Sequence, residues 1–177
     1  MMIGIFSDVH GDSAAIALAL DAVKSAERIF FLGDVHEFVP EVKQCIDMLR
    51  AAKVTAVRGN CDRHGVIGDR DGSYQAWLAG LPKEYRQDDL VFVHEPKDPQ
   101  TAFGREGFHI CFCGHTHRSF VLTEHNQVKL VPGQIVVLKS EQKYIVCIGS
   151  AAKPRGGEAN VAALYDTKTG HLELIAL

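Results

Sequence analysis

Side chains that can bind a metal ion follow five short apolar runs of the sequence. The runs read "IGIFSD", "RIFFLGD", "VTAVRGN", "LVFVHE" and "FHICFCGHT". The first steps between them are regular, because 34 − 8 and 60 − 34 both equal 26, about the length of a strand, a helix and the next strand. The candidate ligands are Asp8 and His10, Asp34, Asn60, His94, and His115 with His117.

Two carboxylates, four imidazoles and one amide form a mixed nitrogen and oxygen donor set. Such a set suits Mn²⁺, Ni²⁺, Fe, Zn²⁺ or Co²⁺ better than Ca²⁺ or a thiolate-bound structural zinc. Two divalent ions about 3.5–4 Å apart can lower the pKa of a bridging water and bind a phosphoryl oxygen. Any one of these residues alone is more simply explained as a turn or core residue, but the ordered set favours a hydrolytic site with two metals, for which we expect Mn²⁺.

The apolar runs predict strands that position these side chains. Their length and near-continuous hydrophobicity are typical of strands buried on both faces. Residues 12–26 between the first two runs are rich in Ala and Leu, with Asp12 and Ser13 as N-cap candidates, and residues 40–52 carry an apolar stripe at helical spacing. Alternating strands and helices predict parallel strands, whose carboxyl ends bring ligands to one edge.

After Thr116 the pattern changes to short strands separated by the turn candidates "EHNQ", "PG", "SEQK" and "DTKTG". We expect an antiparallel sheet to follow the parallel one, with the two sheets packed face to face and helices outside. In the sequence before this point, "YQAWLAGLP" could form a short helix, and "KDPQTAFGREG" is expected to be a loop.

The composition predicts a single domain over residues 1–177 in a reducing compartment. The net charge of −3 and the pI near 6.3 argue against a nucleic-acid polymer as partner. Five cysteines cannot all pair, and most lie in apolar runs, where a thiol acts as a small hydrophobe. Neither a signal peptide nor a membrane-spanning run is evident. We therefore expect a cytoplasmic protein with no membrane partner, and the sequence leaves a homo-oligomer open.

The ordered blocks "SDVHGD", "FLGDVH", "VRGNCD", "VHEP" and "CGHTH" resemble those of the calcineurin-like metallophosphoesterase superfamily. The short length and the GNCD form look most like its small bacterial and archaeal phosphodiesterase-like branch. The resemblance implies a four-layer α/β/β/α sandwich of two mixed sheets flanked by helices. It also implies two divalent metal ions, one bound by Asp8, His10 and His117 and the other by Asn60, His94 and His115, with Asp34 bridging both.

The implied activity is metal-dependent hydrolysis of a phosphoric ester by in-line attack of a metal-bridging hydroxide. We expect small phosphodiesters as substrates. A phosphoprotein or nucleotide phosphatase remains an alternative within enzymes, and a metal-free protein-interaction scaffold is the alternative outside them. The sequence departs from the family pattern at two places. Glu95 follows the ligand histidine where glycine is common, and the segment after Asp34 contains His36 where the family often has a glycine-rich segment.

Cys61 occupies the position where most of the superfamily has a histidine after the asparagine, and there a histidine can protonate a leaving group. A thiol has an unperturbed pKa of about 8.5, against about 6.5 for imidazole, and donates hydrogen bonds poorly. The usual acid is therefore missing, which favours diesters over monoesters. Four roles remain for Cys61: a small residue near the leaving group, which we favour, a covalent nucleophile, a metal ligand or a disulfide partner.

His36 is the candidate replacement for that acid. Asp34, Val35 and His36 repeat the spacing of Asp8, Val9 and His10, so both side chains of an extended segment would face the same way. His36 would then donate a proton or bind a phosphate oxygen. The alternative is a histidine on a surface loop.

Overall fold

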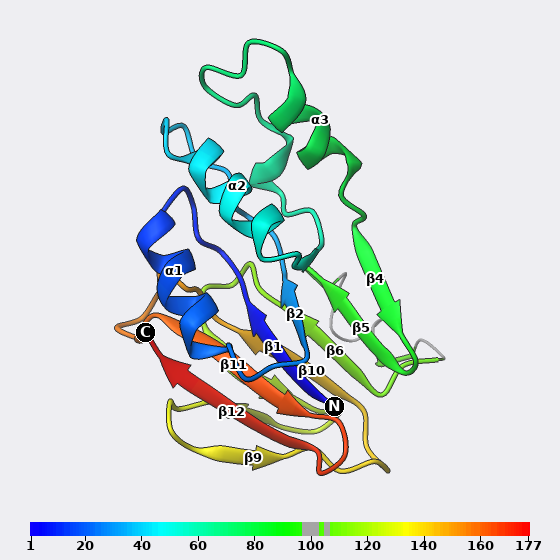
Figure 1. Cartoon of the computed structure of the whole chain (residues 1–177). Helices are drawn as coiled ribbons and strands as arrows, with labels where there is room; N and C mark the ends of the chain where they lie inside the picture. The colour runs from blue at the N-terminus through cyan, green and yellow to red at the C-terminus, as the bar shows by residue number, and fades with distance from the viewer. Residues whose placement is uncertain (97–102, 105–106) are drawn as a thin grey trace.

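The computed structural model describes residues 1–96, 103–104 and 107–177, and arranges their strands in two six-stranded sheets (Figure 1). The strands of the first sheet are β1 (Met2–Phe6), β2 (Arg28–Phe31), β3 (Thr55–Ala56), β9 (Ile135–Val137), β11 (Val161–Asp166) and β12 (His171–Ala176). Those of the second are β4 (Glu84–Gln87), β5 (Leu90–Val93), β6 (Ile110–Cys113), β7 (Ser119–Leu122), β8 (Gln127–Lys129) and β10 (Tyr144–Ile148). The described helices are α1 (Ser13–Ala22), α2 (Val42–Ala51), α3 (Ser73–Gly80) and the 3₁₀ turn η1 (Cys61–Arg63).

Both sheets are mixed. The first has the order β3-β2-β1-β11-β12-β9, with β1, β2 and β3 parallel and the other neighbours antiparallel. The second has the order β4-β5-β6-β10-β7-β8, in which β5, β6 and β10 are parallel. The predicted sandwich of two mixed sheets with flanking helices is confirmed.

The main core lies between the two sheets. Ile3 and Ile5 of β1 alternate with residues that face the helices, as expected for a strand buried on both sides. Phe30 of β2 stacks on Phe92 of β5 with ring centroids 3.8 Å apart. Since these side chains are fully buried, this layer fixes how the two sheets, and hence their loops, face each other.

Helices α1 and α2 cover the outer face of the first sheet (Figure 1). The α2 stripe predicted from the sequence is confirmed, because Val42, Cys45, Ile46 and Leu49 are all buried. Asp12 caps α1 as expected by accepting a hydrogen bond from the Ala15 N–H at 2.9 Å.

The outer face of the second sheet is covered in part by Phe103 and Phe108. They pack with the outward side chains of β5 and β6, such as Val91 and Val93. The predicted loop at residues 97–107 falls largely outside the described residues. The short helix expected near residue 74 is present as α3, and β4 after it was not predicted.

The expectation of a separate antiparallel sheet after the parallel one is wrong. The C-terminal strands divide between the sheets: β11, β12 and β9 extend the first, and β10, β7 and β8 extend the second. Consequently "EHNQ" and "DTKTG" form hairpin connections as predicted, whereas "PG" and "SEQK" link strands of different sheets. Among the described residues, no helix combines the length and apolar character needed to cross a membrane.

Candidate metal centre

All seven predicted ligands lie in loops that directly follow strands. Those after β1, β2 and β3 lie along one edge of the first sheet, because these strands are parallel. Those after β5 and β6 lie likewise along one edge of the second. The structure brings these two edges together, so that side chains more than 100 residues apart in the sequence are in contact.

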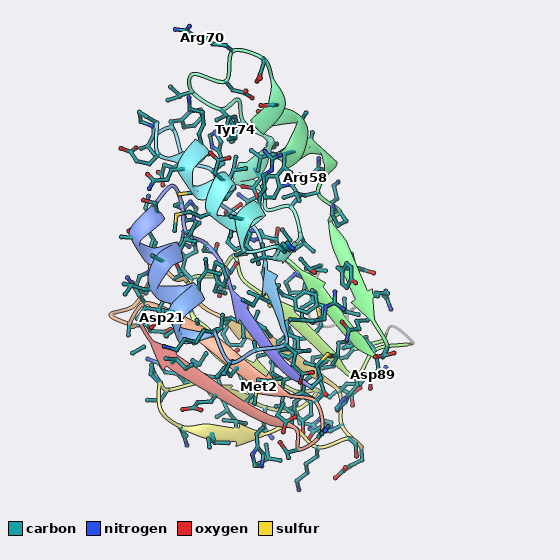
Figure 2. The ribbon with its side chains drawn as sticks, viewed as in Figure 1. Met2, Asp21, Arg58, Arg70, Tyr74 and Asp89 are labelled. Carbon is teal, nitrogen blue, oxygen red and sulfur yellow. The ribbon has the colours of Figure 1, made fainter. Side chains whose placement is uncertain are left out.

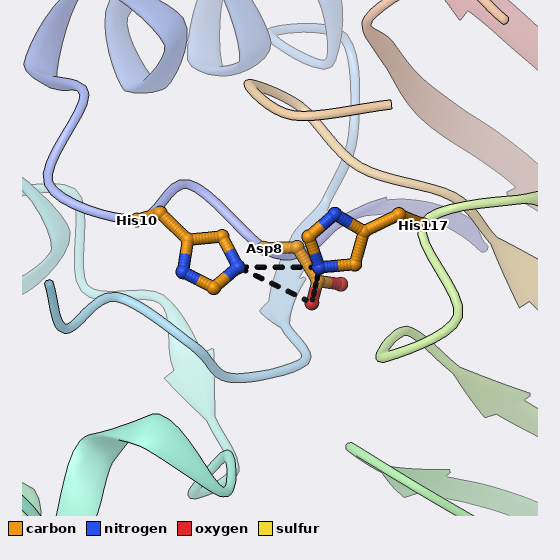
Figure 3. A group of neighbouring side chains, drawn as sticks. All are labelled: Asp8, His10 and His117. Carbon is orange, nitrogen blue, oxygen red and sulfur yellow. Dashed lines mark hydrogen bonds and ion pairs between the residues drawn. The ribbon is translucent and has the colours of Figure 1, made fainter. Parts of the chain in front are cut away.

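The first group consists of Asp8, His10 and His117 (Figure 3). The Nε2 atoms of the two imidazoles lie 3.2 Å apart. Asp8 Oδ1 lies 3.3 Å from His117 Nε2 and 3.9 Å from His10 Nε2. Three potential ligand atoms from two distant loops therefore point into one small space.

The second group consists of Asn60, His94 and His115. Asn60 Oδ1 lies 3.0 Å from His94 Nε2 and 2.8 Å from His115 Nδ1. The two imidazole nitrogens are 3.3 Å from each other. This trio repeats the compact geometry of the first group, with an amide oxygen in place of a carboxylate.

Asp34 joins the two groups. Its Oδ2 lies 3.3 Å from His94 Nε2 and 3.9 Å from His10 Nε2, so a single oxygen faces both sides. Asp8 Oδ1 is buried and accepts no hydrogen bond among the described residues, which is costly for a carboxylate unless a cation compensates it. The donor set and this unsatisfied oxygen fit metal ions, and the grouping is the one implied by the family resemblance.

Five of the seven predicted ligand residues have left-handed backbone conformations. Residues other than glycine are strained in this region. Their φ angles are 57° at Asp8, 45° at His10, 59° at Asp34, 65° at His115 and 58° at His117. Strain of this kind persists only where surrounding contacts fix it, and it concentrates at functional sites.

Two glycines allow the loops to approach the central aspartates. A Cβ atom on Gly59 would lie 2.1 Å from Asp34 Oδ1, and one on Gly114 would lie 2.1 Å from Ser7 Oγ and 2.4 Å from Asp8 Oδ2. These glycines precede Asn60 and His115, so their small size explains the GN and GH pairs in the sequence.

Asp62 fixes the loop that carries Asp34, and sequence reasoning did not single it out. Its carboxylate is fully buried and accepts four backbone N–H bonds. Oδ1 accepts from Val35 and His36, and Oδ2 accepts from Asp34 and Gly59, at 2.7–3.0 Å. Burial raises the pKa of this carboxyl, and the four donors oppose that shift because they favour the charged form. Its place in the GNCD block was the available signal.

Backbone carbonyls orient two of the histidines. His94 Nδ1 is 2.8 Å from the Leu32 carbonyl oxygen, and His117 Nδ1 is 2.5 Å from that of Lys153. A proton on each Nδ1 leaves Nε2 free to face the site, as metal-binding histidines require. Ser150 supports this arrangement, because its Oγ donates to the Asp8 carbonyl at 2.7 Å and accepts from the Lys153 N–H.

The charges inside the site are strongly coupled. Burial alone would raise the pKa of Asp34, but hydrogen bonding to His94 lowers it to about 2. Burial alone would lower the pKa of His94, but Asp34 and Asp8 raise it to about 9. The two side chains therefore form an ion pair without metal, and a cation bound by His94 must displace its proton.

Comparison with known proteins decides the family. A family model described as the calcineurin-like phosphoesterase superfamily domain matches residues 1–170. The chain belongs to this superfamily. A curated relative, the uncharacterized protein MJ0912 of Methanocaldococcus jannaschii, is 26% identical over an alignment that covers 98% of this chain and 86% of the relative.

Two solved structures show the shared fold. A metallophosphoesterase from Sphaerobacter thermophilus has a TM-score of 0.86 at 22% identity, covering 100% of this chain and 88% of the other. An archaeal phosphodiesterase has a TM-score of 0.63 at 16% identity, with 100% of both chains covered. Within the calcineurin-like superfamily, the chain thus shares its architecture with bacterial and archaeal enzymes of similar extent.

Cys61, where most of the calcineurin-like superfamily has histidine, lies at the centre rather than turned away from it. Asn60 Nδ2 is 3.3 Å from Cys61 Sγ, which also lies within 4.8 Å of the ligand atoms of His10 and Asp34. Burial and the charges of Asp34, Asp62 and Asp8 raise the pKa of this thiol to about 12. All five cysteines, Cys61 included, are free, so no disulfide forms.

His36 does not face the site as the D-x-H repeat suggested. The segment is not extended, because Asp34 has a φ of 59°, and the alternation argument therefore fails. The His36 side chain is buried, with Nε2 3.0 Å from the Gly65 carbonyl oxygen and its ring against Phe38 and His64. Within the described part of the chain, its imidazole makes no hydrogen bond, ion pair or ring contact with the seven predicted ligands, and it is not on the surface either.

Glu95, the other departure from the superfamily pattern, lies beside the second group. Its Oε1 is 3.4 Å from His115 Nε2, and the side chain is largely exposed. It also lines a groove of about 530 Å³ that opens next to Asn60 and His94. The departure from the superfamily pattern at Glu95 therefore lies in the lining of this groove.

Proposed function

We propose that this calcineurin-like phosphoesterase is a dinuclear-metal-dependent phosphodiesterase acting on small phosphodiesters. The observation that carries the proposal is the pair of ligand groups that share Asp34, with the buried Asp8 Oδ1 left without a donor. Manganese is the metal that we propose first, with nickel, iron, zinc and cobalt as alternatives of similar ligand preference.

In this proposal Asp8, His10 and His117 hold one ion, and Asn60, His94 and His115 hold the other. Bound there, two divalent ions would supply Lewis acids that lower the pKa of a water and polarise the phosphate. Asp34 links the two groups. Its Oδ1 accepts a hydrogen bond from the Cys61 N–H at 2.8 Å, and its Oδ2 faces a histidine of each group.

The preference for diesters rests on Cys61. Expelling an alkoxide from a monoester is helped by a proton donor close to the leaving oxygen. A thiol is a poor donor, and His36 contacts the Gly65 carbonyl instead of the ligand groups. We therefore propose that the chain favours esters whose leaving groups need little protonation, and that Cys61 is a small residue beside the leaving group.

A metal-by-substrate matrix tests the proposal. Mn²⁺, Ni²⁺, Zn²⁺ and Mg²⁺ are paired with mono-, di- and cyclic phosphoesters and with phosphopeptides. We expect the highest kcat/KM on diesters with a transition metal. Asp34→Asn should lose at least about 100-fold, since even partners that only support metal ligands are worth 10–100-fold. Asp21→Asn, on the exposed surface of α1, is the matched control and should keep full activity (Figure 2).

The alternatives give different outcomes in the same experiment. Activity confined to phosphopeptides or nucleoside monophosphates would replace the phosphodiesterase assignment with a phosphatase. Less than one transition metal per purified chain after supplementation, together with no hydrolysis, would favour the protein-interaction scaffold. All seven ligand positions are filled, which argues for the enzyme.

A further inference from the structure

The groove beside the second ligand group has a charge and a shape that the metal centre does not account for. It has a volume of about 530 Å³, within the range of small-molecule sites. Asn60 and His94, two of the predicted ligands, are among the residues that line it, so the groove borders the metal centre. A substituent of a phosphoester bound at the centre therefore has a direct path into it.

One wall of the groove is cationic. Four basic residues and two acidic ones line it, an excess of two positive charges in a chain whose net charge is −3. The basic residues are Arg58, Arg63, Lys83 and Arg86, and the acidic ones are Glu84 and Glu95.

Two of the four basic side chains are not paired with described residues of the protein. Arg86 pairs with Glu84 at 2.6 Å, and Arg58 donates to the Ala79 carbonyl. Arg63 and Lys83 are exposed and have no hydrogen bond or ion pair with any described residue. These two cations remain available to an anionic ligand.

The backbone places the two free cations on the same groove although they are 20 residues apart. Arg63 ends η1, and Lys83 precedes β4. The Arg58 N–H donates to the Pro82 carbonyl at 2.8 Å, which joins the loop before η1 to the segment before β4. The juxtaposition therefore rests on a backbone contact rather than on flexible side chains alone.

The floor of the groove is apolar. It is formed by the outward side chains of Val91 and Val93 on β5 and by Phe108 and Cys111 beside them. A purely inorganic anion would leave this floor in contact with water, whereas an organic group would cover it. The groove thus combines an apolar base with free cations at its rim, which suits an organic group that carries its own negative charge.

We propose that this groove binds one organic arm of the phosphodiester substrate and that this arm carries a second phosphate, held by Arg63 and Lys83. The inference rests on the proposed phosphodiesterase function and names the substrate class of that site. In this proposal the metal centre neutralises the scissile phosphate, and Arg63 and Lys83, which are not among its predicted ligands, neutralise the second phosphate.

The test compares Arg63→Ala/Lys83→Ala with Lys24→Ala/Lys168→Ala. The control removes the same charge away from the ligand loops: Lys24, between α1 and the start of β2, pairs with Asp21, and Lys168 lies in the β11–β12 hairpin beside the start of β1. All four side chains are exposed, so both variants should fold. Substrates are thymidylyl-thymidine with and without a terminal 5′- or 3′-phosphate, and bis(p-nitrophenyl) phosphate.

We expect wild-type kcat/KM to be about 5–30-fold higher for a terminally phosphorylated dinucleotide, and the Arg63/Lys83 variant to lose this preference while the control keeps it. Both variants should still hydrolyse bis(p-nitrophenyl) phosphate, which has no second phosphate for Arg63 and Lys83 to bind. Independently, thymidine 3′,5′-bisphosphate should bind the chelator-treated protein more tightly than thymidine in calorimetry, with an affinity that falls as salt rises.

The outcomes separate the two proposals. If no diester is hydrolysed with any metal, the proposed function fails. If bis(p-nitrophenyl) phosphate is hydrolysed but the terminal phosphate gives no preference, or both double variants behave alike, the groove proposal is overturned while the phosphodiesterase stands. Equal binding of thymidine and its bisphosphate to the metal-free protein would overturn the groove proposal as well.

Discussion

Replacing Asp62 by asparagine should loosen the metal centre although Asp62 is not among the seven predicted ligands. Each carboxylate oxygen of Asp62 accepts two backbone N–H bonds at 2.7–3.0 Å, and the side chain is fully buried. In Asp62→Asn one oxygen becomes an NH₂ group, which cannot accept. Whichever way the amide turns, two buried N–H groups lose their acceptor.

The magnitude follows from that count. An unsatisfied buried donor costs about 1–3 kcal/mol, so two cost about 2–6 kcal/mol, a large part of a typical stability of about 5–15 kcal/mol. Because the Asp34 N–H is one of the four donors, the Asp34 carboxylate should also lose its fixed position. We expect metal affinity to fall about 10–100-fold, as for other groups that hold metal ligands in place.

Two measurements check this prediction. Urea unfolding of the chelator-treated protein gives the loss of stability without a metal contribution, and calorimetric titration with Mn²⁺ gives the affinity. Asp71→Asn is the matched control, because the exposed Asp71 carboxylate accepts a single backbone N–H from Ser73, and it should leave both quantities unchanged. A loss below about 1 kcal/mol with normal Mn²⁺ binding in Asp62→Asn would refute the reasoning.

Three further substitutions test other parts of the centre. Gly114→Ala should destabilise the metal-free protein and weaken metal binding, because its Cβ would lie 2.1 Å from Ser7 Oγ; a normal urea midpoint and normal metal content would contradict the packing argument. Cys61→His should raise alkyl monoester hydrolysis relative to diester hydrolysis in metal-loaded protein, and an unchanged ratio would exclude the missing-acid explanation. His36→Ala should slow alkyl and activated aryl diesters equally, since its imidazole contacts the Gly65 carbonyl; a selective loss on alkyl esters would show that His36 donates the proton after all.

The clustering of the seven predicted ligands could be expected from the sequence because the rule behind it is local. A buried parallel strand ends in a loop, and the loop's first polar residues lie at the carboxyl edge of the sheet. All five apolar runs formed strands, and the helical stripe of α2 is buried as its spacing predicted. The assignment of C-terminal strands to sheets failed because β10 and β11 are both short, mostly buried apolar strands, and their pairing partners depend on long-range packing.

The alternation argument for His36 failed for a physical reason. It assumed that the backbone continues regularly past the end of a strand, so that neighbouring side chains alternate. The loops instead turn through left-handed residues, including Asp34 with a φ of 59°, and Cys61 opens a 3₁₀ turn. Glycine signals such a turn most clearly in a sequence, whereas aspartate and histidine enter the left-handed region only occasionally and so did not mark these turns.

The strained ligand loops and their supports form one system. The strain of a left-handed residue other than glycine is roughly 1–2 kcal/mol, and five of the predicted ligands have this conformation. The contacts that offset it come from residues that bind no metal: four N–H bonds to Asp62, the Ser150 bond to the Asp8 carbonyl, and the close approach allowed by Gly59 and Gly114. Without them the loops would relax to ordinary conformations and the two ligand groups would separate. The geometry of the candidate centre therefore depends as much on these supports as on the seven predicted ligand side chains.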